Sequence, residues 1–148
     1  KPRKLTADSI ISALSLRPWN ASLKTLCWKI GESFVKVSNH PQDIYGHIYA
    51  ERKAWEQVQN EQGRYKDQAD IGLARVGRST EAYGYYKKGL LPPGQIHSRA
   101  KRYAVKLFLA HYHHVAYELH YGKQPPNPYV IDHMNHNDII SPPNWPMA

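Results

Sequence analysis

The feature that most constrains the fold is one long helical pattern near the C-terminal end of the chain, residues 98–121. Apolar residues recur there at three- and four-residue steps, Val105 and Leu109 among them. Residues 90–94, Leu-Leu-Pro-Pro-Gly, precede this pattern, and Gly122 closes it with the residue type that most often ends helices. The chain is therefore expected to contain a long α-helix bounded by two breaks.

Shorter helical patterns occupy most of the sequence before that helix. Asn20 is a good N-cap for a helix that Gly31 is expected to end. Residues 34–37 are β-branched and alternating, which favours a short strand or an extended link. Apolar residues at helical spacing predict further helices. In chain order, helices are expected at about residues 6–14, 20–31, 42–60, 66–76 and 80–88.

Composition narrows the classes of protein to consider. The chain has 148 residues and a formal net charge of +8, which favours a polyanionic partner, although charge of this kind also simply keeps proteins soluble. Cys27 is the single cysteine, so neither an internal disulfide nor a cysteine-rich zinc site can form. That usage fits a reducing, cytoplasmic compartment. No apolar run approaches the ~18 residues of a membrane span.

The middle of the sequence, residues 67–90, resembles a helix-turn-helix of the Myb-like and SANT-like type, whose pattern is D-x-x-I-A-x-x-L-G-R-S-x-x-A-V. The resemblance implies that Ile71 and Ala74 face the core. It further implies that Gly77 supplies the turn and that Ser79 caps the second helix.

A helix-turn-helix places its second helix in the major groove of DNA. Trp55, in the preceding helix, takes the place of the core aromatic that such domains usually carry. The alternative is a plain helical hairpin whose lysines only face solvent. The predicted DNA-contacting residues are Arg75, Arg78, Thr80, Tyr83, Lys87 and Lys88, together with Arg99, Lys101 and Arg102 of the long helix.

The most specific pattern lies in residues 113–144, where His-His-Val-Ala-Tyr-Glu-Leu-His-Tyr-Gly-Lys-Gln-Pro-Pro is followed by Val-Ile-Asp-His-Met-Asn-His-Asn. It resembles HNH endonucleases of the phage and homing type, which read H-R-L-V-W-x-L-H-Y-G-x-x-P-P and then V-I-D-H-I-N-G-N. The resemblance implies a ββα-metal fold. Residues 130–132 are accordingly expected to be extended, with His133 at the end of a strand.

The same resemblance implies a hydrolytic site. His133 would be the general base, because a neutral imidazole near pH 7 can activate water. Asp132 would bind Mg²⁺ or Mn²⁺, a hard cation that stabilises charge on a phosphodiester. Asn144 would orient the histidine, and His136 lies close enough in sequence to touch phosphate. The family's last ligand comes from a later helix, which is expected only beyond Ala148.

Three interpretations remain open at this stage. The chain is a metal-dependent HNH-type DNA endonuclease, or a non-catalytic DNA-binding regulator of phage or mobile-element origin with a degenerate HNH fold, or a helical protein-interaction domain. The fold class expected is mainly α with a small α+β C-terminal part. The expected organisation is a helical N-terminal segment at residues 1–40, a helix-turn-helix-like module at 41–94, and a long helix with a partial HNH-like segment at 95–148.

Overall fold

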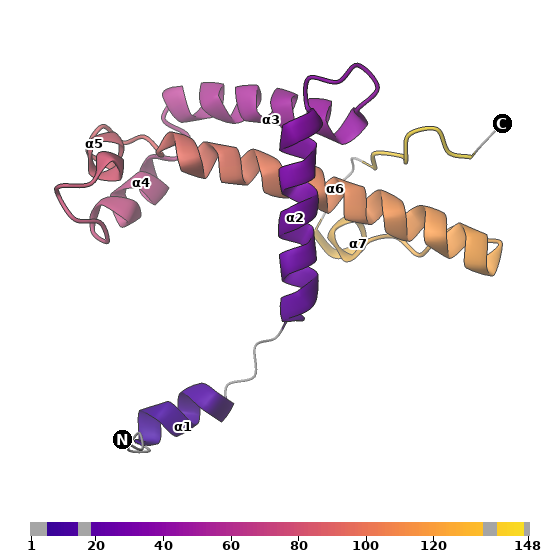
Figure 1. Ribbon diagram of the computed structural model, residues 1–148, viewed down its shortest axis with the longest axis horizontal. Helices are drawn as coiled ribbons and strands as arrows, with labels where there is room; N and C mark the ends of the chain where they lie inside the picture. Colours follow the sequence, from indigo (N-terminus) through magenta and orange to yellow (C-terminus); the bar gives the residue numbers. More distant parts are fainter. Residues whose placement is uncertain (1–5, 15–18, 135–138, 147–148) are drawn as a thin grey trace.

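A computed structural model describes residues 6–14, 19–134 and 139–146 of the chain. These residues form seven α-helices and no strand, which confirms the mainly α fold. In Figure 1, α1 lies apart from the other helices, and α6 runs through the centre of the molecule. The helices are α1 (Ala7–Leu14), α2 (Ala21–Val37), α3 (Ile44–Glu61), α4 (Lys66–Leu73), α5 (Glu81–Lys87), α6 (Pro93–Tyr121) and α7 (Tyr129–Met134).

The centre of the fold is the antiparallel pair formed by α3 and α6. Tyr45, near the start of α3, contacts His111 in the second half of α6. Asn60, near the end of α3, exchanges two hydrogen bonds with the backbone of Leu91, at 3.0 and 2.9 Å. Buried Tyr49 packs between these points, so the two helices are joined along most of α3.

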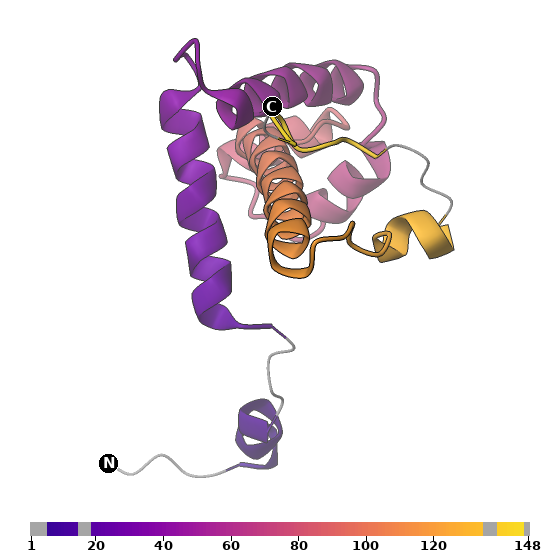
Figure 2. The same ribbon diagram turned by 90° about the vertical axis from the view of Figure 1, so that its right-hand side faces the viewer.

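Helix α2 crosses α6 steeply in Figures 1 and 2, and Gly31 lies at the crossing. A Cβ atom on this buried glycine would come within 2.7 Å of Lys101 Cγ and 3.1 Å of Val105 Cγ2. The prediction that Gly31 ends the helix is therefore wrong, as is the extended conformation predicted for residues 34–37. The helix continues because Phe34 stacks on Tyr45, with ring centroids 5.2 Å apart, and this tertiary packing outweighs local preference.

Helices α4 and α5 form a hairpin at the N-terminal end of α6 (Figure 1). The predicted helix-turn-helix segment is thus two helices with a turn between them, as expected. Gly89 ends the second of them with a φ of 74°. Their shared core consists of Tyr65, Ala69, Tyr86, Leu91 and Ile96.

Two residues of this hairpin predicted to face the core do not, and the predicted helix cap is also wrong. Ile71 is 54% exposed and Ala74 is exposed, whereas Ala69 is fully buried. The cause is the close approach of the helices at Gly72, where a Cβ would lie 2.6 Å from the ring of Tyr86. That contact turns the face containing Ala69 and Gly72 inward. The cap is Thr80, not Ser79, and its hydroxyl accepts a hydrogen bond from the amide of Tyr83.

The long helix begins at Pro93, earlier than predicted, because proline is well tolerated in a first helical turn. Gly122 ends it in the left-handed conformation, with a φ of 64°, as predicted. The boundary expected after residue 94 falls inside the first turn of α6. Since Ile96 packs into the α4–α5 core, the hairpin and α6 are joined by shared apolar contacts.

Residues 129–134 form the short helix α7, so the extended conformation predicted for residues 130–132 is wrong. The amides of Ile131 and Asp132 both donate to the carbonyl oxygen of Pro128, at 2.9 and 3.3 Å. An isolated strand would leave such groups without partners, and the described parts of the chain contain no strand to pair with it. A helical turn satisfies them locally, and proline is well suited to its start.

Among the described residues, none of the helices combines the length and the apolar character needed to cross a membrane.

Candidate nucleic-acid interface

A basic cavity of about 240 Å³ lies between α3 and α6. Its cations Arg99, Arg102 and Lys106 follow one another on α6 at spacings of three and four, which places them on one face of the helix. Arg52 of α3 supplies the fourth cation, and Glu56 the single carboxylate of the lining. The lining of this basic cavity therefore carries a net charge of about +3, four positive charges less one negative charge.

Glu56 is buried, with 2% of the residue exposed, and both of its carboxylate oxygens accept hydrogen bonds. Arg52 donates to Oε1 from Nη2 and Nε, at 2.8 and 3.0 Å. Arg99 Nε and the Tyr65 hydroxyl donate to Oε2, at 2.7 and 2.6 Å. Burial alone would raise the pKa of Glu56, but these hydrogen bonds outweigh it and hold that pKa below its ordinary value.

The hydrogen bonds to Glu56 position Arg52 and Arg99 but use only some of their N–H donors. A guanidinium has five N–H donors, and Arg52 spends two of them on Glu56. Arg99 spends one on Glu56 and one on Gln68 of α4, at 3.3 Å. Both therefore keep donors for a ligand while their positions are set by a buried carboxylate. That combination suits recognition of phosphate, which arginine binds with paired N–H groups.

Aromatic rings enclose the Arg52 guanidinium. Its carbon Cζ lies 4.1 Å from the ring centre of Trp55 and 4.5 Å from that of Tyr103. Arg64 also lies over Trp55, at 5.5 Å. Trp55 is 40% exposed, so its predicted role as a core aromatic is wrong: it lies at the surface, where two arginines contact its ring.

The structure brings together some of the predicted DNA-contacting residues of α6 but not all. Arg99 and Arg102 line the basic cavity. Lys101 instead turns toward α2, where it forms an ion pair with Glu32 and lies 5.6 Å from the ring of Trp28. Sequence reasoning missed Arg52 and Lys106. Lys106 shares the helical spacing of Arg99 and Arg102, whereas only the pairing of α3 with α6 reveals Arg52.

The predicted contacts in the α4–α5 hairpin are mostly exposed cations, and none of them lines that cavity. Arg75 and Arg78 lie in the connecting turn, and Lys87 and Lys88 at the end of α5. Thr80 acts as the N-cap, and its hydroxyl also donates to the carbonyl of Gly77 at 2.7 Å. Tyr83 is half-buried.

The predicted hydrolytic residues do not form one centre in the structure. Asp132 and His133 are exposed, successive residues of α7, and successive residues of a helix point in directions about 100° apart. In Figure 1, α7 lies below α6, whereas residues 139–146, which include Asn144, run above it. Trp145 anchors that segment by donating to the Glu118 carboxylate on α6. His136 lies outside the described residues.

The Mg²⁺ or Mn²⁺ site stays a prediction of the sequence resemblance. Within residues 6–14, 19–134 and 139–146, no three histidine, cysteine or acidic side chains are grouped as a metal would require. Asp132 would be one carboxylate ligand of such a site, and a hard cation needs several further oxygen ligands. We derive no metal-dependent step from these residues.

His111 and His114 of α6 make contacts within the protein that stabilise the fold. His111 is buried between the Tyr45 hydroxyl, at 2.9 Å from Nδ1, and the carbonyl oxygen of Ile140, at 2.9 Å from Nε2. Burial lowers the pKa of His111 below its ordinary value, against the opposing effect of the Ile140 hydrogen bond. His114 pairs with Glu118 at 3.2 Å, and His120 is exposed.

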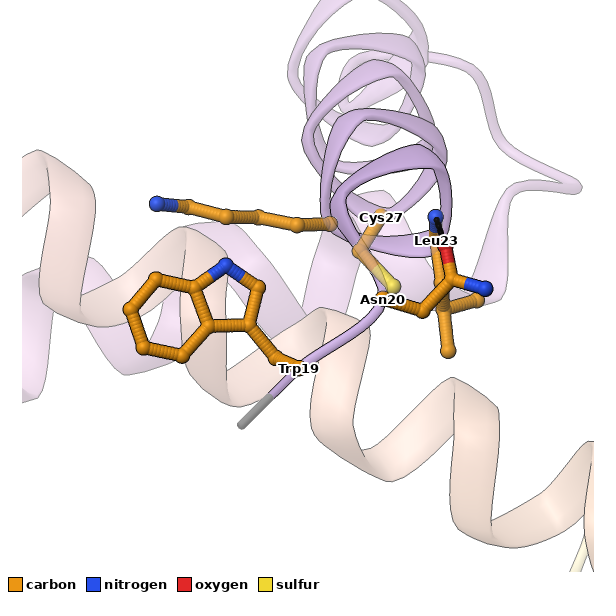
Figure 3. Close-up of a pocket in the computed structure, with 5 residues that line it drawn as sticks. Trp19, Asn20, Leu23 and Cys27 are labelled. Atoms are coloured by element: carbon orange, nitrogen blue, oxygen red, sulfur yellow. Dashed lines mark hydrogen bonds between the residues drawn. The ribbon is translucent and has the colours of Figure 1, made fainter. Parts of the chain in front are cut away.

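A second cavity, of about 420 Å³, lies at the N-terminal end of α2 (Figure 3). Trp19, Leu23 and Cys27 give it a largely apolar lining, and the Asn20 side chain caps the helix beside it by accepting from the Leu23 amide at 3.0 Å. Leu23 is 52% exposed, so the surface is open. Lys24 is the one charged residue of the lining, and its Nζ lies 5.3 Å from the ring centre of Trp19.

Comparisons of the chain with protein-family models, with curated proteins and with solved structures give no match.

Proposed function

We propose that this protein binds DNA through a basic surface formed by the cavity between α3 and α6 and the adjoining α4–α5 hairpin. The observation that carries the proposal is the cavity itself: four cations line it, and its one carboxylate is buried and fully hydrogen-bonded. A cavity of this kind attracts phosphate, and the net charge of +8 favours a polyanion over a small anion.

The hairpin extends the same surface. The Arg99–Gln68 hydrogen bond links α6 to α4, so an arginine of the cavity contacts the hairpin directly. Contacts to phosphate position a protein on DNA, and residues of the hairpin would then meet the bases. We do not extend the proposal to hydrolysis, because Asp132 and His133 lie on a helix and diverge. Cleavage stays a prediction of the sequence resemblance.

Binding of a labelled DNA duplex, measured by fluorescence anisotropy over a range of salt concentrations, tests the proposal. The double variant Arg102→Ala/Lys106→Ala removes two exposed cations of the cavity. Each lost phosphate contact lowers the slope of log K against log salt by about 0.9, so the slope should fall by nearly two.

The control Lys29→Ala/Lys36→Ala removes the same charge from exposed positions on α2. If both double variants weaken binding equally, only the overall charge matters and the basic cavity is not the site. If the unmodified protein shows no salt-dependent binding, the proposal fails altogether.

A further inference from the structure

An apolar groove of about 320 Å³ shares a wall with the basic cavity, and that wall consists of Arg52 and Tyr103. On the far side of this pair, the groove is lined by Ile48 of α3 and Leu107 of α6. Ile140 closes it from the C-terminal segment. A phosphate-binding cavity and an apolar groove are thus adjacent.

Several contacts hold the arginine of this wall in place. Arg52 is held by two hydrogen bonds to buried Glu56, and its guanidinium lies against the rings of Trp55 and Tyr103. Planar groups held in this way are the surfaces on which nucleobases stack in single-stranded complexes. Trp55 and Ile140 remain 40% and 50% exposed, so the groove offers uncovered apolar surface.

Paired bases cannot reach such a surface, because the duplex stacks their faces against one another. An unpaired base presents both its flat apolar face and its hydrogen-bonding edge. The exposed carboxylate of Glu51 belongs to the groove lining and can accept from an amino or imino group of that edge. The adjoining cavity supplies the opposite charge for the phosphate of the same nucleotide.

We propose that the groove and the cavity together bind one unpaired nucleotide of a DNA strand, with its base in the groove and its phosphate among Arg52, Arg99, Arg102 and Lys106. The inference rests on the proposed DNA-binding function and deepens it, because it makes an extrahelical or single-stranded base the preferred ligand.

Three labelled probes of the same sequence test this proposal: a fully paired duplex, the duplex with one unpaired thymidine, and the duplex with an abasic residue at that position. The protein should bind the unpaired thymidine about five- to one-hundred-fold more tightly than the paired duplex, the range that one stacked base supplies. The abasic probe keeps the phosphate and loses the base, so it should lose this preference.

Variants then assign the preference to the groove. Trp55→Ala should abolish it, and because Trp55 also packs against Arg52, its affinity for the paired duplex is measured alongside. Ile140→Ser should also abolish the preference and should leave affinity for the paired duplex within about twofold, because Ile140 lines the groove but not the cavity. Trp28→Ala is the control, since this exposed tryptophan lies on α2 and outside the groove, and it should keep the preference.

The outcomes separate the two proposals. Salt-dependent binding of all three probes with equal affinity would overturn the nucleotide site and leave DNA binding intact. Failure to bind any probe would overturn both. If Trp55→Ala and Ile140→Ser convert a dimer to a monomer in sedimentation without changing probe preference, the groove binds a second copy of the chain and the inference is wrong.

Discussion

Nε2 of His111 lies 2.9 Å from the carbonyl oxygen of Ile140, joining the middle of α6 to the C-terminal segment. A carbonyl oxygen can only accept, so Nε2 carries the proton and Nδ1 accepts from the Tyr45 hydroxyl. The neutral imidazole is therefore fully satisfied in a buried position. Because Ile140 lines the apolar groove, this hydrogen bond also holds one wall of that groove in place.

Acidification should weaken this attachment. The pKa of His111 is lower in the folded protein than its ordinary value of 6.5, so the unfolded state binds the proton more readily. The contribution of His111 to stability is complete above about pH 6.5 and is lost as pH falls below that value toward the folded pKa. Thermal unfolding and hydrogen exchange of residues 139–146, measured between neutral and mildly acidic pH, should show this loss.

His111→Phe should remove the share of this loss that His111 contributes and leave the share from His97, whose pKa burial also lowers, whereas the exposed His47→Gln should leave both shares. Glu56 affects stability in a lower pH range than His111, because its pKa is lowered in the folded protein from an ordinary value of 4.5. Its contribution is complete above that value and is lost only as pH falls through its folded pKa. A stability profile that stays flat down to the carboxylate range would contradict the role given to His111.

Glu56→Gln should separate stability from DNA binding. Losing the buried carboxylate leaves Arg52 and Arg99 without their charge partner, and because both arginines are partly exposed, a destabilisation of about 1–3 kcal/mol is expected. Urea unfolding measures it, with the exposed Glu51→Gln as control. DNA affinity of the folded variant should not fall, since the cavity becomes more positive. A variant that is fully stable would show that the network contributes little.

Gly72 and Gly84 make a matched pair of helix glycines. Gly72→Ala should destabilise the hairpin by about 1–3 kcal/mol, because the new Cβ would lie 2.6 Å from the ring of Tyr86. Gly84→Ala meets no described atom within 4 Å and should stabilise α5 by about 0.5–1 kcal/mol through helix propensity alone. Melting curves of both variants show whether their changes in stability have opposite signs. Two changes of the same sign would contradict the packing of α4 on α5.

The triple variant Arg78→Ala/Lys87→Ala/Lys88→Ala tests whether the hairpin contacts DNA. These exposed cations should each contribute about one unit to the salt slope if they meet phosphate. Retention on immobilised duplex over a salt gradient measures the combined contribution of the three cations to the salt dependence. Unchanged retention would confine DNA binding to the basic cavity and leave the hairpin a structural element.

His133→Ala tests the predicted hydrolysis. Because α7 directs Asp132 and His133 apart, the variant should nick supercoiled plasmid in Mg²⁺ no more slowly than the unmodified chain, and it should bind DNA equally well. Parallel reactions in EDTA establish any metal dependence. A loss of about 10²- to 10⁴-fold, the usual contribution of a positioned acid or base, would instead support the HNH-type chemistry.

The sequence by itself determined the features that depend on near neighbours in the chain. Asn20 and Gly122 mark a helix start and a helix end because capping needs only residues within one turn. The cationic face of α6 follows from spacings of three and four, which any helix converts into a stripe. The mainly α character was predictable for the same reason.

Tertiary structure decided whatever depends on partners distant in sequence. Gly31 continues a helix instead of ending it because α6 passes close beside it. Residues 129–134 are helical where the sequence pattern favoured a strand, since a strand needs a pairing partner and a helical turn does not. Arg52 joins Arg99 only through the antiparallel packing of α3 on α6, because side-chain packing and burial, rather than local spacing, set the relation between helices far apart in the chain.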